Sequence, residues 1–106
     1  MDAFTEAVQR GAALLDDLDP QWFEHIDLGR LDMGECARCI LGQIYGNYTT
    51  GLDRIGNDLD QPAWLGYSRD LEVSHGFEAE VITPADHIHL SLAWTAEIRR
   101  RRKGGK

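Results

Sequence analysis

Residues 34–48 read GECARCILGQIYGNY and hold both cysteines of this 106-residue chain. Asp32 and Glu35 have the spacing of a capping box, in which the first side chain caps a helix and the second reaches back to it. The apolar residues that follow cover more than half of a helical wheel, which predicts a helix buried on most of its sides. We therefore expect a central helix over residues 33–48, around which the other elements pack.

The two cysteines, Cys36 and Cys39, are spaced C-x-x-C, and this spacing allows three interpretations. A structural zinc site needs two further ligands, but His87 and His89 would point to opposite sides of a predicted helix, so a third histidine such as His75 would be required. A redox dithiol is typical of a strand–C-x-x-C–helix unit, and the chain lacks that context. We favour buried thiols that pack in the core, with no metal and no cofactor.

Other segments are assigned from the spacing of apolar residues and from turn signals. Residues 4–18 predict an amphipathic helix, and residues 20–28 predict a short one. The glycine-rich residues 49–67 predict a loop with one brief turn around Leu52 and Ile55, and residues 68–75 predict another short helix. Because no run of alternating strand pattern is present, the fold class is all-α, a single-domain bundle of about four to five helices.

A long C-terminal helix is predicted over residues 84–101, with Thr83 as its cap and Pro84 at its first position. Two apolar stripes follow nearly opposite sides of this helix: Ala85, Ile88, Leu92 and Ala96 form one, and Leu90, Trp94 and Ile98 form the other. A helix that is apolar on two sides either lies in the centre of the fold or binds another molecule. We assign the second stripe, Leu90, Trp94 and Ile98, to a partner-binding surface.

Charge divides the chain into two parts. Residues 1–98 carry all 18 acidic residues and five of the 11 basic ones, and the last eight residues carry the other six. An acidic body repels nucleic-acid phosphates and attracts a basic protein surface, so we expect a basic protein partner. The acidic loop around Asp58 and Asp60 is the second candidate for contact with that partner.

The basic segment sets the domain boundary that we predict. Residues 1–98 form a single helical domain, and residues 99–106 form a disordered tail. The tail can contact an anion through five residues: Arg99, Arg100, Arg101, Arg102 and Lys103. Nucleic acid is expected to bind only there, if at all.

Several classes of function lack their sequence signatures. The chain has no glycine-rich phosphate loop, nucleophile elbow or zinc-protease motif, so we predict that it is not an enzyme. No apolar run approaches the roughly 18 residues of a membrane span. The N-terminus resembles neither a secretion signal nor a transit peptide, and two cysteines without an export signal favour the cytoplasm.

The motifs taken together resemble a known family. The string CARCILGQIYGNY is preceded by WFEHIDLGRLDM and followed by HGF and LAWTAEI. This pattern resembles small proteins of actinobacteria and their phages, in which C-[IV]-L-G-Q-[ILF]-[YF]-G-x-Y lies between such segments. The family carries no known biochemical function, so the resemblance implies an actinobacterial or phage setting and supplies no catalytic residues.

These observations favour a non-enzymatic helical module that binds a host protein with a basic surface and modulates or inhibits it. The first alternative is a small zinc- or thiol-dependent protein that uses Cys36, Cys39 and His75. The second alternative is nucleic-acid contact through the basic tail. The sequence leaves the oligomeric state and the role of Gln43 and Asn47 open.

Overall fold

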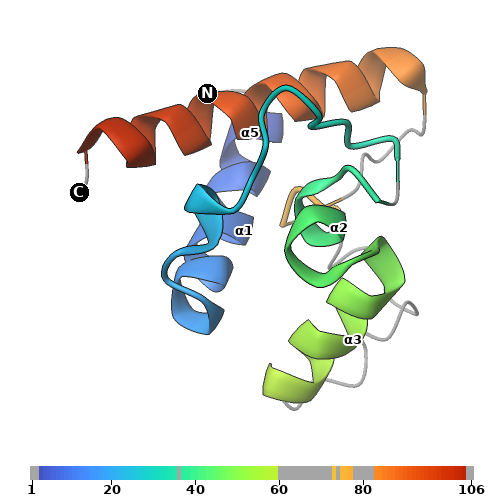
Figure 1. The fold of residues 1–106 in the computed structure, drawn as a ribbon. Helices are drawn as coiled ribbons and strands as arrows, with labels where there is room; N and C mark the ends of the chain where they lie inside the picture. Colours follow the sequence, from blue (N-terminus) through green and yellow to red (C-terminus); the bar gives the residue numbers. More distant parts are fainter. Residues whose placement is uncertain (1–2, 36, 60–72, 74, 78–82, 105–106) are drawn as a thin grey trace.

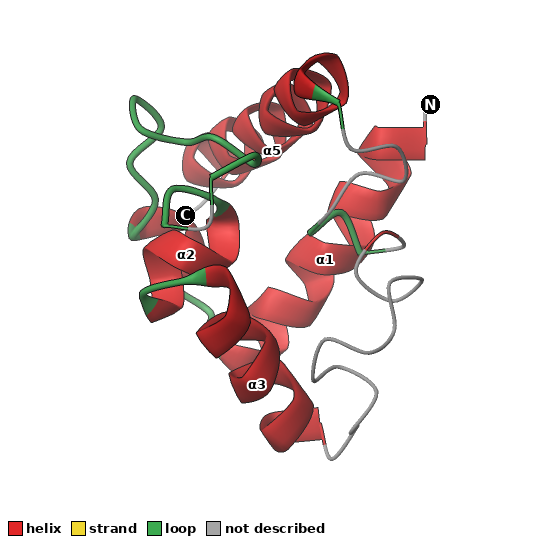
Figure 2. Cartoon of the chain, turned by 90° about the vertical axis from the view of Figure 1, so that its right-hand side faces the viewer, coloured by secondary structure: helices red, strands yellow, loops and turns green. Residues whose placement is uncertain are grey.

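The computed structural model describes residues 3–35, 37–59, 73, 75–77 and 83–104, and the structural statements below concern these residues. Their regular structure is entirely helical, with no strand (Figure 2). The all-α prediction is therefore confirmed. The elements are α1 (Ala3–Leu18), the 3-10 turn η1 (Trp22–Glu24), α2 (Ile40–Tyr45), α3 (Tyr48–Leu59) and α5 (Pro84–Gly104).

The long helix α5 lies across one end of the molecule and packs against α1 (Figure 1). The short helices α2 and α3 pack against each other, and η1 contacts α5. Residues 19–35 and 37–39 belong to the long connection that runs from α1 along α5 and back to α2 (Figure 1). The first and last helices thus form one packed pair, although most of the chain separates them.

The predicted central helix over residues 33–48 is wrong in its first half, because α2 begins only at Ile40. Asp32 does not cap a helix. Its carboxylate accepts a hydrogen bond of 2.9 Å from the backbone N–H of Gly34, and its own N–H donates to the carbonyl oxygen of Arg38 at 3.2 Å. These bonds close a loop, and the backbone groups that they use are no longer available to a helix.

The second half of the predicted helix is interrupted at Gly46, which ends α2 with a φ of 105°. Such a positive φ is favourable for glycine and breaks the helical path. Asn47 then starts α3, because its side-chain oxygen accepts a hydrogen bond of 2.8 Å from the N–H of Thr50. The loop predicted over residues 49–67 is therefore wrong as far as residue 59, and the remainder lies outside the described residues.

The short helix predicted over residues 20–28 is present only as the three-residue turn η1. Gln43 explains why the chain stays irregular beyond it. The amide oxygen of Gln43 accepts from the N–H of Asp27 at 2.7 Å, and its nitrogen donates to the carbonyl oxygens of Asp27 at 3.2 Å and of Arg38 at 3.0 Å. One side chain thus serves the backbone groups of two loop segments, and its role is structural.

The C-terminal helix begins where the sequence predicts. Thr83 caps it, because its hydroxyl accepts a hydrogen bond of 3.1 Å from the N–H of Asp86. The helix continues to Gly104, so the prediction of a disordered tail is wrong for residues 99–104. Of the short helix predicted over 68–75, only residues 73 and 75 lie within the described part of the chain.

The core lies between α5, α1 and α2. Its buried members on α1 include Val8, Ala12 and Leu15, and α5 contributes three large side chains. Gly11 of α1 lies directly against the segment at His75, since a Cβ at this position would collide with the carbonyl oxygen of His75. The other large, fully buried side chains are Trp22, Ile40, Leu41 and Phe77.

Candidate functional site

The two apolar stripes of α5 face in the directions opposite to those that we predicted. Leu90, Trp94 and Ile98 are each 0% exposed, so the assignment of this stripe to a partner surface is wrong. The reason is that these three side chains pack within the chain against α1, α2 and η1 residues of the core. A surface for a partner must therefore be sought elsewhere on α5.

Trp94 is the centre of the buried side. Its ring stacks on Phe77 with centroids 5.8 Å apart and meets Trp22 edge to face at 5.7 Å. Its indole N–H donates a hydrogen bond of 2.6 Å to the carbonyl oxygen of Gly76. Three aromatic residues from distant parts of the sequence, Trp22, Phe77 and Trp94, therefore meet in one cluster.

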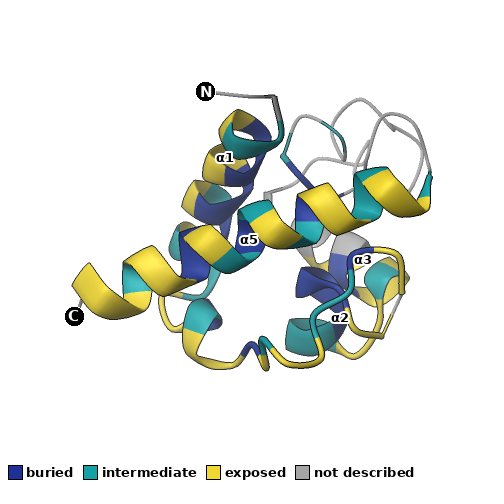
Figure 3. Cartoon of the chain, turned by 90° about the horizontal axis from the view of Figure 1, so that it is seen from above, coloured by how far each residue is buried: buried dark blue, intermediate teal, exposed yellow. Residues whose placement is uncertain are grey.

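The exposed side of α5 carries the other stripe. Ile88 is 59% exposed and Leu92 is 61% exposed, and they are the exposed large hydrophobic residues among those described. Ala85 and Ala96 are exposed as well and extend the stripe in both directions. Figure 3 shows exposed positions recurring along the whole outward side of α5. We call Ala85, Ile88, Leu92 and Ala96 the outer face of α5.

A groove borders this face on the side of α1. It has a volume of about 530 Å³, and its lining comprises Phe4, Thr5, His89, Leu92 and Ala93. The rings of Phe4 and His89 lie 6.3 Å apart on the two helices that form its walls. Because Leu92 belongs both to the groove and to the outer face, the two features form one continuous surface.

Two of the five predicted tail contacts are used by the fold itself. Arg101 binds the carboxylate of Asp16 at 2.7 Å and that of Glu97 at 2.8 Å. Arg102 donates to the carbonyl oxygens of Phe23 at 2.7 Å and of Ile26 at 2.6 Å. Arg101 and Arg102 thus hold residues 16–26 against α5, and contact of the tail with an external anion stays a prediction.

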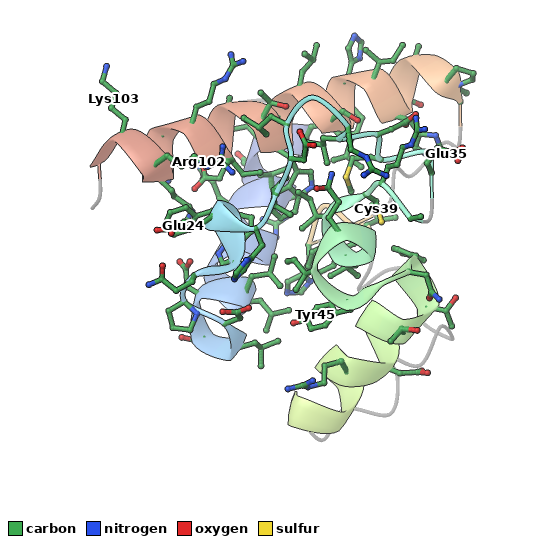
Figure 4. The ribbon with its side chains drawn as sticks, in the orientation of Figure 1. Glu24, Glu35, Cys39, Tyr45, Arg102 and Lys103 are labelled. Carbon is green, nitrogen blue, oxygen red and sulfur yellow. The ribbon has the colours of Figure 1, made fainter. Side chains whose placement is uncertain are left out.

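The other basic residues at this end of α5 are exposed: Arg99, Arg100 and Lys103. Arg100 contacts the buried carboxylate of Glu97 at 2.5 Å while two thirds of its own side chain stays exposed. In Figure 4, Lys103 points away from the body of the molecule, whereas Arg102 points toward the loop beneath α5. Positive charge therefore remains on the outward side of the last turns.

Of the two predicted acidic contacts, Asp58 lies in the last turn of the helix α3 and not in a loop, and Asp60 lies outside the described residues. Carboxylates do line the surface at the other end of α5. Asp32 and Glu35 share an open cavity of about 370 Å³ with Pro84, His87 and Ile88. Negative charge thus borders the outer face at its N-terminal end.

Cys39 is 2% exposed and performs a role that the sequence analysis missed. Its sulfur caps α2, since it accepts a hydrogen bond of 3.2 Å from the N–H of Gly42. The thiol lines a small cavity of about 50 Å³ together with Glu35, Tyr48 and His87. This cap is difficult to predict from the sequence, because cysteine is not among the residues that usually cap helices.

The zinc alternative gains no support from this part of the chain. Across the described residues, no three potential ligands are arranged to hold a metal ion. His75 stacks on Phe77, with the two rings 6.5 Å apart and inclined by 12°. Cys36, the other thiol of this alternative, lies outside the described residues.

Comparison with known proteins does not assign a family or a function to the chain. No protein-family model, curated protein or solved structure matches the chain. None of the helices described here is long and apolar enough to cross a membrane. The surface of α5 and the groove beside it are therefore the basis for an inference about function.

Proposed function

We propose that the chain is a non-enzymatic protein-binding module whose contact surface is the outer face of α5 together with the groove beside α1. The observation that carries this proposal is the exposure of Ile88 and Leu92, each about 60%, on one side of a single helix. Isolated exposed apolar residues are common, but a row of them next to an apolar-lined groove is typical of an interaction surface.

The rigidity of α5 supports the proposal. The side opposite to the outer face is fixed by the fully buried Leu90, Trp94 and Ile98, and the last turns are fixed by Arg101 and Arg102. A surface that is already held in one conformation loses little conformational entropy when a partner binds. An apolar helix face beside a groove also suits the helix-in-groove mode of recognition.

The charge of the chain narrows the class of partner. A net charge of −7 disfavours a nucleic acid and favours a protein with a basic surface. The resemblance to small actinobacterial and phage proteins supports a phage or mobile-element setting. In such a setting the partner would be a host protein whose activity the module modulates or inhibits.

A photo-crosslinking experiment tests the proposal. A benzophenone amino acid is placed at position 92, and a matched chain carries it at position 49, where Thr49 is exposed on α3. Crosslinks to a protein should form from position 92 and not from position 49, and Ile88→Asp should suppress them. Equal crosslinking from both positions, or none from position 92, would contradict the proposal.

Salt dependence separates this proposal from nucleic-acid contact through the basic end of α5. A protein contact centred on Leu92 should be weakened by Leu92→Asp far more than by Arg99→Gln. Binding to an oligonucleotide that falls steeply with salt and is lost with Arg99→Gln would favour the nucleic-acid alternative instead.

A further inference from the structure

We infer that the protein seated on the outer face of α5 is a second copy of this chain, packed antiparallel across a two-fold axis near Leu92. The inference rests on the proposed function, because it uses the same surface. It adds a second occupant of that surface, with which a host protein would compete, and the direction in which the two helices run. The pattern of the stripe and the charges at its two ends both suit a second copy.

The stripe has the spacing of a helix-pairing seam. Ala85, Ile88, Leu92 and Ala96 follow one another at intervals of three, four and four residues. These are the intervals at which side chains share one side of a helix, and they resemble the seam of a coiled coil. Small alanines flank the two large side chains, which allows a second helix to approach closely along the row.

Basic residues continue the same stripe beyond Ala96. At about 100° per residue, Arg99 and Lys103 lie on the side of α5 that bears Leu92. Both are exposed, and Lys103 points away from the body (Figure 4). The C-terminal end of the seam is therefore positively charged.

Acidic residues border the opposite end. Asp32 and Glu35 line the cavity that also contains Pro84 and Ile88, at the start of α5. Figure 4 shows Glu35 and Lys103 at opposite ends of the molecule along α5. The two ends of one seam thus carry opposite charges on either side of an apolar centre.

A two-fold axis at Leu92 makes this surface complementary to itself. An antiparallel copy places Ile88 opposite the partner's Ala96, and it places Ala85 opposite the partner's Arg99. The positive end of each copy then lies beside the partner's Asp32 and Glu35. A parallel arrangement would place like charges together, which destabilises an interface.

The dimensions agree with such a pairing. A helix of 21 residues is about 31 Å long, so two antiparallel copies of α5 can align over the whole seam. A two-fold interface uses the same patch on both subunits, so every favourable contact is made twice. An antiparallel second copy is complementary to this surface only because the charge reverses along the stripe. Binding of an unrelated partner does not require that reversal.

The test is sedimentation equilibrium of the full chain over a range of concentrations. We expect a monomer–dimer equilibrium that Leu92→Asp shifts to monomer. Arg99→Glu and Glu35→Arg should each weaken the dimer by about tenfold or more, because each places like charges together twice. The doubly substituted chain, with both changes, should recover most of the affinity.

Two matched controls keep the result specific. Thr49→Asp and Asp53→Arg alter exposed residues of α3, which does not pack on α5, and neither should change the equilibrium. Circular dichroism of each variant identifies any that fails to fold, and the recovery in the double variant does not depend on Leu92→Asp.

Three outcomes would overturn the inference. They are a chain that stays monomeric at the highest concentration, a dimer that Leu92→Asp leaves intact, and a double variant that dimerises no better than either single one. None of these outcomes contradicts the proposed function, because a crosslink from position 92 to a different protein would still support it. The proposed function would be contradicted instead if position 92 formed no crosslink to any protein while the chain dimerised through another part of its surface.

Discussion

The indole N–H of Trp94 donates a hydrogen bond of 2.6 Å to the carbonyl oxygen of Gly76, at a site where both residues are buried. This bond joins the last helix to the segment 75–77, and Phe77 of the same segment stacks on the indole ring. Trp94 therefore combines apolar burial with the satisfaction of a buried backbone oxygen, and these two contributions can be measured separately.

Substitution of Trp94 should distinguish the two contributions. Trp94→Ala removes a fully buried ring and should lower the free energy of unfolding by about 3–5 kcal/mol. Trp94→Phe retains an aromatic ring but leaves the Gly76 oxygen without its donor, and it should cost about 1–3 kcal/mol. Urea denaturation followed by circular dichroism measures both. Equal losses for the two variants would contradict a separate role for the hydrogen bond.

Gly11 should resist a substitution that normally stabilises helices. Alanine is favoured over glycine in a helix by about 1 kcal/mol. At this position, however, the new Cβ would collide with the carbonyl oxygen of His75 and would lie 3.1 Å from the ring of Trp94. Overpacking of this kind costs about 1–3 kcal/mol, so we expect Gly11→Ala to destabilise the fold.

The control for Gly11 is Gly104→Ala, since a Cβ on Gly104 would meet no atom within 4 Å. Thermal denaturation should show a lower melting temperature for Gly11→Ala and no loss for Gly104→Ala. A rise in the melting temperature of Gly11→Ala would contradict the close packing of α1 against the segment at His75.

Arg101 should contribute to stability, and its neighbour Arg99 should not. Arg101 bridges Asp16 and the buried Glu97, and its guanidinium group lies 5.8 Å from the centre of the Trp22 ring. Arg101→Gln should lower the free energy of unfolding by about 1–2 kcal/mol, because Glu97 and Asp16 lose charged donors in a partly exposed site. Arg99→Gln, at an exposed position, should change it by less than about 0.5 kcal/mol. Chemical denaturation measures both free energies of unfolding. Similar losses for Arg101→Gln and Arg99→Gln would contradict a specific contribution of Arg101 to stability.

Cys39 should tolerate serine better than alanine. Its sulfur accepts from the N–H of Gly42, so Cys39→Ala leaves the first turn of α2 without its cap and should cost about 0.5–2 kcal/mol. Cys39→Ser keeps an acceptor at the same place and should cost less, although serine is the more polar residue. Urea denaturation of both variants measures these losses. If Cys39→Ser lost more stability than Cys39→Ala, the capping role of the thiol would be contradicted.

The first and last helices were predictable because their signals are local. The apolar period of residues 4–18 and the cap at Thr83 need no distant partner, and both predictions agree with α1 and α5. The buried stripe of α5 could also have been chosen correctly. Trp94 with Leu90 and Ile98 offers far more apolar area than a stripe that contains two alanines, so it gains more from burial.

The middle of the chain was mispredicted because the same residues serve two local structures. Asp32 can cap a helix or close a turn, and the turn is favoured by a backbone bond to Arg38, six residues away. The amide of Gln43 reaches Asp27 across 16 residues, which no local pattern reveals. The acidic surface at the start of α5 was missed for the same reason, since Asp32 and Glu35 come to Ile88 only through the folded loop.

The bonds from Arg102 to Phe23 and Ile26 have a consequence for how the chain reaches its folded state. They span 79 and 76 residues of sequence, and the ring contact of Trp94 with Trp22 spans nearly as many. Small helical proteins usually fold fast because their contacts are close in sequence. Here the core forms only when the two ends of a long loop meet, so we expect folding to be slower than its helix content would suggest and the transition state to require α1 and α5 together.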